Sequence, residues 1–243
     1  MVSVPAPLFV SETDSTNSWC RRQLDQLPDG FAVYTTCQTA GRGRRGRAWA
    51  NAPGQGLYYT IVCKRPMADP AALPLAASLA AVHALEEQLG VRCQVKWPND
   101  LVWQGKKLGG ILCEAAQGAI LCGIGINLMQ DEAYFAQNGL VHGVSAAQIL
   151  GRMPGADTPE RLAQAMSEIF AEGLEDFYRQ GFAAVREEYL SRCANLGRRV
   201  RFDGGEGRAV DVDETGRLVV DTGKGKQAVF TGEVTVQGIY GVK

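Results

Sequence analysis

The most distinctive segment of the chain is a loop at residues 41–47 (Gly-Arg-Gly-Arg-Arg-Gly-Arg), which sets four arginines among three glycines. Arginine presents a rigid fork of donors that suits phosphate and carboxylate groups, and glycine lets the backbone close around a bound anion. Without a ligand, the like charges would repel one another on a permissive backbone. The loop therefore predicts a segment that becomes ordered around a small anion, such as a nucleotide or an adduct of a carboxylate with a phosphate.

A solvated basic loop and an RNA-binding patch are the alternative interpretations of this arginine loop. Arginine–glycine segments that bind nucleic acid usually repeat, lie in disordered tails and belong to basic domains. This loop occurs once, between two strand-like segments, in a chain of formal net charge -1 and pI about 6.2. These features favour a ligand loop.

Two further clusters place polar residues at the ends of predicted strands. In Lys96-Trp97-Pro98-Asn99-Asp100 proline stops a strand, and the lysine before the turn points across the sheet end, where ligands tend to bind. In residues 123–127 (Gly-Ile-Gly-Ile-Asn) the strand glycines allow close approach to the backbone. No helix pattern opens directly behind these glycines, which is unlike a dinucleotide-binding fingerprint. Each cluster alone is also compatible with an ordinary turn or strand.

Residues 14–17 (Asp-Ser-Thr-Asn) have the pattern of a helix cap, with Ser15 at the start of a helix. A second interpretation is that their polar atoms face a ligand. The residues alone leave both interpretations open.

Familiar nucleophile motifs do not occur in the sequence. It contains no GxSxG, GKS/T or HExxH pattern, and His83 and His142 are its only histidines. The seven cysteines form neither a CxxC pair nor a Cys/His cluster, so we expect reduced thiols, no disulfide framework and no protein metal site. The pattern favours a reaction that needs alignment and charge neutralisation of its substrates.

Hydrophobic periodicity predicts one large domain of helices and strands over residues 1–195. Extended segments are expected at residues 31–37, 57–63, 92–96, 109–116 and 119–127, so that the arginine loop joins two strands of one sheet. Helices are expected from Ser15 to about Leu27, from Ala71 to Leu89 before Gly90, from an N-cap at Thr158 to Gly181, and over a short stretch that carries Val185, Tyr189 and Cys193.

From Gly197 the texture changes to short strands separated by glycine turns, at residues 200–202, 208–212, 218–220, 227–230 and 234–236. This spacing predicts a small β-barrel over residues 196–243. With 46% hydrophobic and 21% charged residues, the chain falls in the ordinary globular class. Met1 to Phe9 has no signal-peptide pattern and no stretch is apolar enough to span a bilayer, so a cytoplasmic protein is expected.

Taken together and in order, five motifs closely resemble those of the biotin protein ligases. Each is modestly specific, whereas the ordered set, which spans roughly residues 10–130, is very specific. The motifs are Asp14–Asn17, Gln38–Arg47, Lys96–Asp100, Lys107–Glu114 and Gly123–Asn127. The resemblance implies an α+β fold, with a mixed β-sheet catalytic domain (residues 1–195) followed by a small C-terminal SH3-like β-barrel (residues 196–243).

The resemblance also implies a two-step reaction. The biotin carboxylate attacks the α-phosphorus of ATP to give biotinyl-AMP and pyrophosphate, and a lysine of a carrier protein then takes the biotinyl group. Such chemistry depends on bringing two anions together and stabilising the charge that develops. ATP and biotin are therefore the expected substrates, with Mg²⁺ on the phosphates.

By the same resemblance, roles are implied for particular residues. Ser15, Thr16 and Gln38 would contact biotin, and Lys96 would bridge the biotin carboxyl and the phosphate. Gly110 and Gly125 would give room beside the biotin. The implied catalytic residues are Lys96, Arg42 and Arg44; the biotin site is Ser15, Thr16, Asn17, Gln38, Gly41, Arg42, Gly43, Arg44, Lys96, Gly110 and Gly125; the nucleotide site is Arg44, Arg47, Trp49, Lys96 and Asn127.

The implied partner is the biotin carboxyl carrier protein of acetyl-CoA carboxylase, together with other biotin-dependent carboxylases. Some family members carry an N-terminal winged-helix domain and act as repressors. Here the pattern begins about ten residues after Met1, so we expect a monofunctional ligase with no DNA or membrane partner. Gly109 stands where alanine is common, which affects strand packing more than chemistry. The sequence does not decide between a monomer and a homodimer.

Two rival functions remain for comparison. Lipoate ligases share the fold and the adenylate chemistry, but they usually show a His-Asp pair, and neither histidine here is followed by aspartate. A nucleic-acid binder would show affinity that falls steeply with salt and ignores biotin. The near-neutral net charge argues against the second rival.

Overall fold

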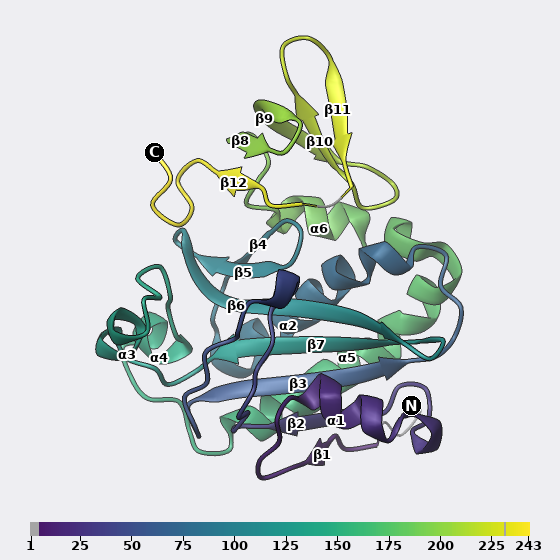
Figure 1. Ribbon diagram of the computed structural model, residues 1–243, viewed down its shortest axis with the longest axis vertical. Helices are drawn as coiled ribbons and strands as arrows, with labels where there is room; N and C mark the ends of the chain where they lie inside the picture. The colour runs from purple at the N-terminus through teal and green to yellow at the C-terminus, as the bar shows by residue number, and fades with distance from the viewer. Residues whose placement is uncertain (1–4, 231) are drawn as a thin grey trace.

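The structure is a computed structural model that describes residues 5–230 and 232–243. Its largest element is a seven-stranded sheet with the order β1-β2-β3-β7-β6-β5-β4 (Figure 1). β1 pairs with β2 in parallel and all other neighbours are antiparallel, so the sheet is mixed, as the resemblance implied. The strands are β1 (Leu8–Phe9), β2 (Ala32–Thr35), β3 (Gly56–Cys63), β4 (Gln94–Lys96), β5 (Asp100–Trp103), β6 (Lys106–Ala116) and β7 (Ala119–Asn127).

The arginine loop connects β2 to β3, which are antiparallel neighbours, so the prediction that it joins two strands of one sheet is confirmed. β7 has the predicted bounds, whereas β2 and β4 are shorter than expected and β6 begins three residues earlier, at Lys106. β1 and β5 were not predicted. β5 was missed because it starts at Asp100, directly after the proline turn that was taken to end the extended segment.

Alternation along the central strands gives the sheet two different faces. Leu57, Tyr59 and Ile61 of β3 point into the larger hydrophobic core, which the helices cover. On the opposite face Val62 and Leu121 pack in a second, smaller cluster beside the first helix. The remainder of that face lies open, because the helix covers only one end of it.

The long helices α2 (Leu73–Leu89) and α5 (Thr158–Gln180) pack on each other and cover one face of the sheet (Figure 1). α1 (Thr16–Arg22) lies against β3 and β7 on the other face. α2 ends as predicted at Gly90, which adopts a left-handed φ of 69°. The remaining helices are α3 (Glu132–Gln137), α4 (Ala146–Leu150) and α6 (Arg186–Arg192).

Two helix predictions need correction. Asp157, not Thr158, occupies the N-cap of α5, although Pro159 lies in the first turn as predicted. The short helices α3 and α4 were not predicted, because each is one or two turns long and carries no extended hydrophobic stripe. Their starts are capped by the side chains of Asp131 and Ser145.

The C-terminal residues form a second, five-stranded antiparallel sheet with the order β11-β10-β9-β8-β12. All five strands were predicted. These strands agree with the expected small C-terminal barrel, although β11 and β12 are not paired within the described residues. The strands are β8 (Arg199–Phe202), β9 (Gly205–Val212), β10 (Leu218–Asp221), β11 (Lys226–Val229) and β12 (Thr235–Val236).

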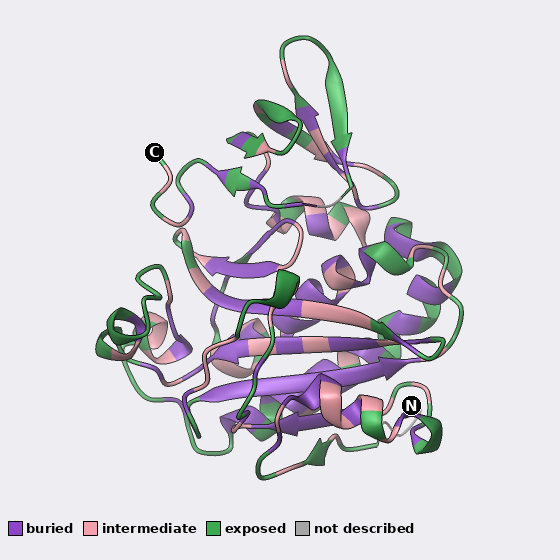
Figure 2. Ribbon diagram, viewed as in Figure 1, coloured by how far each residue is buried: buried purple, intermediate pink, exposed green. Residues whose placement is uncertain are grey.

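Trp97 joins the two sheets. Its side chain is 1% exposed, and its indole Nε1 donates to the Gly216 carbonyl over 2.9 Å. Its backbone N–H donates to Asn195 Oδ1 over 2.8 Å. The buried strands of the large sheet contrast with the exposed outer surface of β11 (Figure 2). The domain boundary between residues 195 and 196 stays a prediction.

In the part of the chain that the structure describes, no helix is long and apolar enough to cross a membrane. All seven cysteines are free thiols. The first four residues of the segment Met1–Phe9, in which no signal peptide was expected, lie outside the described residues.

Candidate functional site

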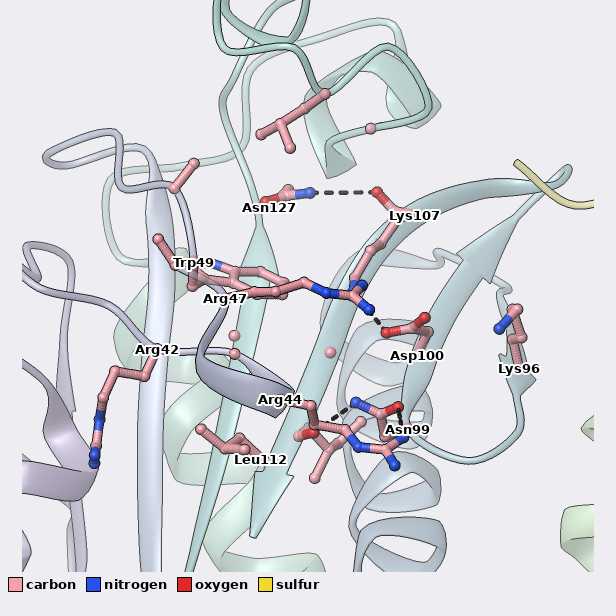
Figure 3. A pocket seen from close by; sticks show the side chains of 18 of the residues that line it. Arg42, Arg44, Arg47, Trp49, Lys96, Asn99, Asp100, Lys107, Leu112 and Asn127 are labelled. Carbon is pink, nitrogen blue, oxygen red and sulfur yellow. Dashed lines mark hydrogen bonds and ion pairs between the residues drawn. The ribbon is translucent and has the colours of Figure 1, made fainter. Parts of the chain in front are cut away.

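A cavity of about 550 Å³ opens on the uncovered face of the large sheet. Its floor is formed by β3, β6 and β7, and its walls by the arginine loop, the turn before β5, the loop after α3 and the C-terminal residues 232–242 (Figure 3). This volume lies in the usual range for small-molecule sites. Except for Gly41, all the predicted site residues line it: Ser15, Thr16, Asn17, Gln38, Arg42, Gly43, Arg44, Arg47, Trp49, Lys96, Gly110, Gly125 and Asn127.

The arginine loop is closed by its own backbone. The Gly43 N–H donates to the Arg47 carbonyl over 2.7 Å, and the Trp49 N–H donates to the Gly41 carbonyl over 2.9 Å. A Cβ added at Gly41 would lie 2.8 Å from the Trp49 carbonyl oxygen, which is too close for any other residue. Gly41 therefore shapes the base of the loop and does not face the cavity.

Arg42 turns away from the centre of the cavity (Figure 3). Its Nη2 pairs with Glu114 Oε2 over 2.7 Å, and the same oxygen accepts from Asn17 Nδ2 over 2.8 Å. The resemblance implied that Arg42, Arg44 and Lys96 act together on the bound anions. In the structure Arg42 lies apart from Arg44 and Lys96. In this conformation Arg42 anchors the loop to β6.

Arg44 points into the cavity and connects two of the sequence motifs. Its Nη1 donates to Asn99 Oδ1 over 2.9 Å, and Asn99 Nδ2 donates to the Ile111 carbonyl over 2.9 Å. Burial lowers the pKa of the Arg44 guanidinium from its ordinary value, and repulsion by Arg45 and Arg47 adds to that effect. The arginine loop is thereby tied to the floor of the cavity.

Lys96 lies at the end of β4 and is 7% exposed. Its Nζ lies 5.4 Å from the centre of the Tyr240 ring, and among the described residues it has no hydrogen-bond or ion-pair partner. Burial lowers the pKa of its amine, while the nearby Asp100 raises it. A buried amine without a close counter-ion is suited to receive an anionic ligand.

A second lysine stands in the cavity. Lys107 Nζ pairs with Asp100 Oδ1 over 2.6 Å and lies 5.3 Å from the centre of the Trp49 ring (Figure 3). Sequence reasoning quoted Lys107 within a motif but did not place it in the site. A bulge in the β5–β6 pairing, between Leu101 and Val102, breaks the simple alternation by which its direction would have been predicted.

A buried polar cluster occupies the end of the cavity beside α1. Gln38 Oε1 accepts from the Thr16 N–H over 2.9 Å, and the Thr60 hydroxyl donates to Asn17 Oδ1 over 2.7 Å and lies 2.8 Å from Thr16 Oγ1. Ser15 is the N-cap of α1 by position, but its side chain makes no capping hydrogen bond. Ser15, Thr16 and Asn17 all line the cavity, and the interpretation that their polar atoms face a ligand stays a prediction.

Comparison with known proteins decides the family. A sequence profile described as the biotin/lipoate A/B protein ligase family matches residues 9–131, and the biotin protein ligase C-terminal domain matches residues 196–236. The chain belongs to the biotin/lipoate A/B protein ligase family. The second match places it among the biotin protein ligases.

Individual relatives agree with this assignment. A biotin--[acetyl-CoA-carboxylase] ligase of Paracoccus denitrificans is 31% identical, over 95% of this chain and 100% of the relative. The bifunctional ligase/repressor BirA of Bacillus subtilis is 28% identical, over 86% of this chain and 67% of the relative. The biotin protein ligase of Aquifex aeolicus, solved in complex with biotin and ATP, has a TM-score of 0.83 and 27% identity, covering 95% of this chain and 97% of that one.

In this biotin protein ligase the Trp49 ring packs on Gly110 and Gly125, the two glycines that were expected to give room beside the biotin, and that expectation stays a prediction. Gly110 and Gly125 are cross-strand partners on β6 and β7. A Cβ at either position would lie 3.0 Å from the Trp49 indole, so the ring rests on bare backbone between them. Only glycine at these two positions leaves room for the Trp49 ring to pack on the sheet.

Further polar groups that sequence reasoning missed also line the cavity of the ligase. Tyr58 is 2% exposed, and its hydroxyl is buried without a hydrogen-bond partner among the described residues, as is that of Tyr134. All residues of the strand that carries Tyr58 are buried, so only the alternation of side chains along the strand could have indicated that Tyr58 faces the cavity. Asn127 Nδ2 donates to the Lys107 and Val144 carbonyls over 3.3 and 3.2 Å and ties the loop after α3 to β6.

Gly125→Val is expected to displace the Trp49 ring and to raise the KM for ATP several-fold, because Trp49 is a predicted nucleotide-side residue. Overfilling of this kind costs about 1–3 kcal/mol of stability. Steady-state kinetics and thermal unfolding would measure both effects. Gly173→Ala in α5 is the control, because an added Cβ there meets nothing within 4 Å. An unchanged KM for ATP in the Gly125 variant would contradict the role of the Trp49 position in nucleotide binding.

Proposed function

We propose that this ligase activates biotin with ATP and then biotinylates a lysine of the biotin carboxyl carrier protein of acetyl-CoA carboxylase. In the first step a biotin carboxylate oxygen bonds to the α-phosphorus of ATP, the bond to the β-phosphate breaks, and pyrophosphate leaves. In the second step the acceptor amine bonds to the biotinyl carbonyl, AMP leaves, and the amine loses a proton. The observation that carries this proposal is one cavity that combines a buried polar cluster with a set of cations.

The polar cluster of Ser15, Thr16, Asn17 and Gln38 suits the ureido ring of biotin, which needs both donors and acceptors. The arginine loop and Trp49 then lie on the nucleotide side. Arg47 and Asn127 would contact the nucleotide, and Gly43 would belong to the biotin side, as the resemblance implies. In this arrangement the carboxylate of biotin and the α-phosphate of ATP meet between the two halves of the cavity.

Lys107 and Lys96 would neutralise the charge on the two reacting anions. The Lys107 side chain is 35% exposed and stands beside Trp49, so we assign it the first contact with the carboxylate and phosphate. Lys96, to which the sequence gave that bridging role, would act from its buried position at the end of β4. Arg44 would supply a third cation from the loop.

Mg²⁺ fits this cavity as a metal carried by the nucleotide. Among the described lining residues, Asp100 and Glu233 are the carboxylates. Mg²⁺ in ATP-dependent enzymes is usually held by one or two carboxylates together with substrate phosphates and water. Asp100, which pairs with Lys107, would hold it together with the substrate phosphates, and the ion would neutralise phosphate charge.

The activity is tested by mass detection of the acyl-adenylate after incubation of the chain with Mg²⁺, ATP and either biotin or lipoate. We expect biotinyl-AMP. Lipoyl-AMP as the main product would replace this proposal with lipoate ligation. Formation of neither adenylate would reject both biotin ligation and lipoate ligation. If biotinyl-AMP forms, transfer to purified carrier protein tests the second step.

Three broader features belong to the same proposal. Further acceptors would be other biotin-dependent carboxylases, and the enzyme would act in the cytoplasm, where its free thiols stay reduced. The catalytic domain would comprise residues 1–195 and the C-terminal domain residues 196–243. Size-exclusion chromatography with light scattering would distinguish a monomer from a homodimer.

The rate of adenylate formation is expected to fall as the pH rises through a value below about 10.4, the ordinary lysine pKa. The cause is that burial lowers the pKa of Lys96 and the charged amine is the required form. A lowered lysine pKa makes folding more favourable as the pH rises through this range, so loss of the Lys96 proton does not itself unfold the chain. A flat profile of kcat/KM up to about pH 10, with the fold intact by circular dichroism, would remove Lys96 from this role.

A further inference from the structure

Tyr240, in the C-terminal segment, contacts Lys96 and the partner of Lys107, Asp100. The Tyr240 hydroxyl donates to Asp100 Oδ2 over 2.9 Å, and its ring centre lies 5.4 Å from Lys96 Nζ. The ring also stacks on His142, with centroids 6.3 Å apart. Tyr240 therefore contacts two segments that are far from it in the sequence, residues 96–100 and the loop that carries His142.

The position of Tyr240 is fixed by its neighbours. Ile239 beside it is 1% exposed and belongs to the large core. The Tyr240 N–H donates to the Gly105 carbonyl over 2.8 Å, at the turn between β5 and β6. Tyr240 has a φ of 54°, a left-handed conformation that is uncommon for an aromatic residue. Such a conformation persists where the surrounding contacts determine it, and it is often found at functional sites.

Asp100 is the group through which Tyr240 can act on the reaction. One carboxylate oxygen accepts from Tyr240 and the other pairs with Lys107, so the carboxylate cannot rotate without breaking a contact. Asp100 is 9% exposed, which makes these contacts stronger than they would be in water. Without the Tyr240 hydroxyl, the carboxylate is free to turn and to draw Lys107 with it.

We propose that Tyr240 is a positioning residue of the first half-reaction, whose hydroxyl holds the Asp100 carboxylate so that Lys107 and Lys96 keep their places. This inference rests on the proposed ligase function. It assigns to the C-terminal segment a part in adenylate formation. A residue that positions charge should change the catalytic rate more than the binding of substrates.

The test compares Tyr240→Phe with Tyr178→Phe. Tyr178 also donates a hydrogen bond to an aspartate, Asp29 Oδ1, over 2.7 Å, but it does not line the cavity. Both variants lose the same kind of bond, so they separate a local structural effect from an effect on the reaction. Each is assayed for biotinyl-AMP formation, for transfer from added biotinyl-AMP to carrier protein, and for thermal unfolding.

Tyr240→Phe is expected to lower kcat for adenylate formation about tenfold, the size expected for a hydrogen bond to a charged group. The KM values for ATP and biotin and the transfer from added biotinyl-AMP should change less than about twofold. Tyr178→Phe should keep the wild-type kcat. A Tyr240→Phe enzyme with the wild-type kcat, or one that loses rate only in parallel with stability, overturns the inference.

A second pair of variants tests the donor itself. Tyr240→Gln keeps a group that can donate to Asp100, whereas Tyr240→Leu does not, and both lack the aromatic ring. We expect the glutamine variant to form biotinyl-AMP several-fold faster than the leucine variant, and equal rates overturn the inference. The wild-type chain is assayed beside these variants. If it makes no biotinyl-AMP, the proposed ligase function itself is rejected, and not only the role of Tyr240.

Discussion

Lys107→Ala is expected to slow biotinyl-AMP formation by about 100- to 1000-fold, the loss typical of removing one charge-stabilising donor from an active site. Lys107 stands in the open part of the cavity, paired with Asp100 and beside Trp49. Its removal leaves the carboxylate of biotin and the phosphates of ATP facing Asp100 without the intervening charge. Single-turnover measurement of pyrophosphate release with saturating substrates gives the rate of this step.

Lys106→Ala is the matched control for this prediction. Lys106 is the neighbouring residue on β6, is exposed and does not line the cavity, so its loss should change the rate less than about twofold. Lys96→Ala, with the fold preserved, should also lose adenylate formation. Normal turnover in Lys107→Ala together with a strong loss in Lys96→Ala would return the bridging role to Lys96, as the sequence predicted.

Arg44→Gly is expected to release biotinyl-AMP into solution about ten- to 100-fold faster than the unaltered enzyme, since it removes both a charge and a hydrogen bond that closes the loop. The Arg44–Asn99 contact ties the arginine loop to the cavity floor. A closed loop excludes water and holds the intermediate until the acceptor arrives. Filtration followed by mass detection would measure free and bound biotinyl-AMP.

Arg45→Gly tests whether the anchor or the charge is responsible. Arg45 lies in the same loop at a φ of 57°, which glycine adopts readily, and its exposed side chain makes no bond to Asn99. This variant should retain the intermediate nearly as well as the wild type. Equal leakage from the two variants would mean that loop charge, not the Asn99 anchor, holds the adenylate.

The large elements of the fold followed from local patterns. α2 and α5 are long enough for hydrophobic spacing and end signals to agree, and β7 is an apolar run bounded by turns. β1, with only Leu8 and Phe9, owes its existence to pairing with β2 and carries no signal of its own. The C-terminal sheet shows a similar limit, because glycine turns predict its strands but not the order in which the strands pair.

The site shows the same division between local and non-local information. The cavity-lining position of most predicted residues followed from family motifs, while their chemical roles stay predictions. Lys107 was missed because a bulge in its own strand β6, where Leu101 pairs with Gly109 but Val102 with Lys107, changes the facing of its side chain. Tyr240 was missed because its contacts with Asp100 and Lys96 span more than 100 residues, as the hydrogen bond at a separation of 140 shows.

The crowding of cations around the cavity has a consequence for the empty enzyme. Repulsion from Arg45 and Arg47 contributes to the lowered pKa of Arg44, and repulsion from Lys107 and Arg44 contributes to that of Lys96. The unliganded native state therefore carries an electrostatic strain that the unfolded chain does not. Anionic substrates relieve it as they bind, so they stabilise the fold beyond the effect of their contacts alone. The resistance of this enzyme to heat and proteolysis should then increase with the concentration of its substrates and be lowest when no substrate is bound.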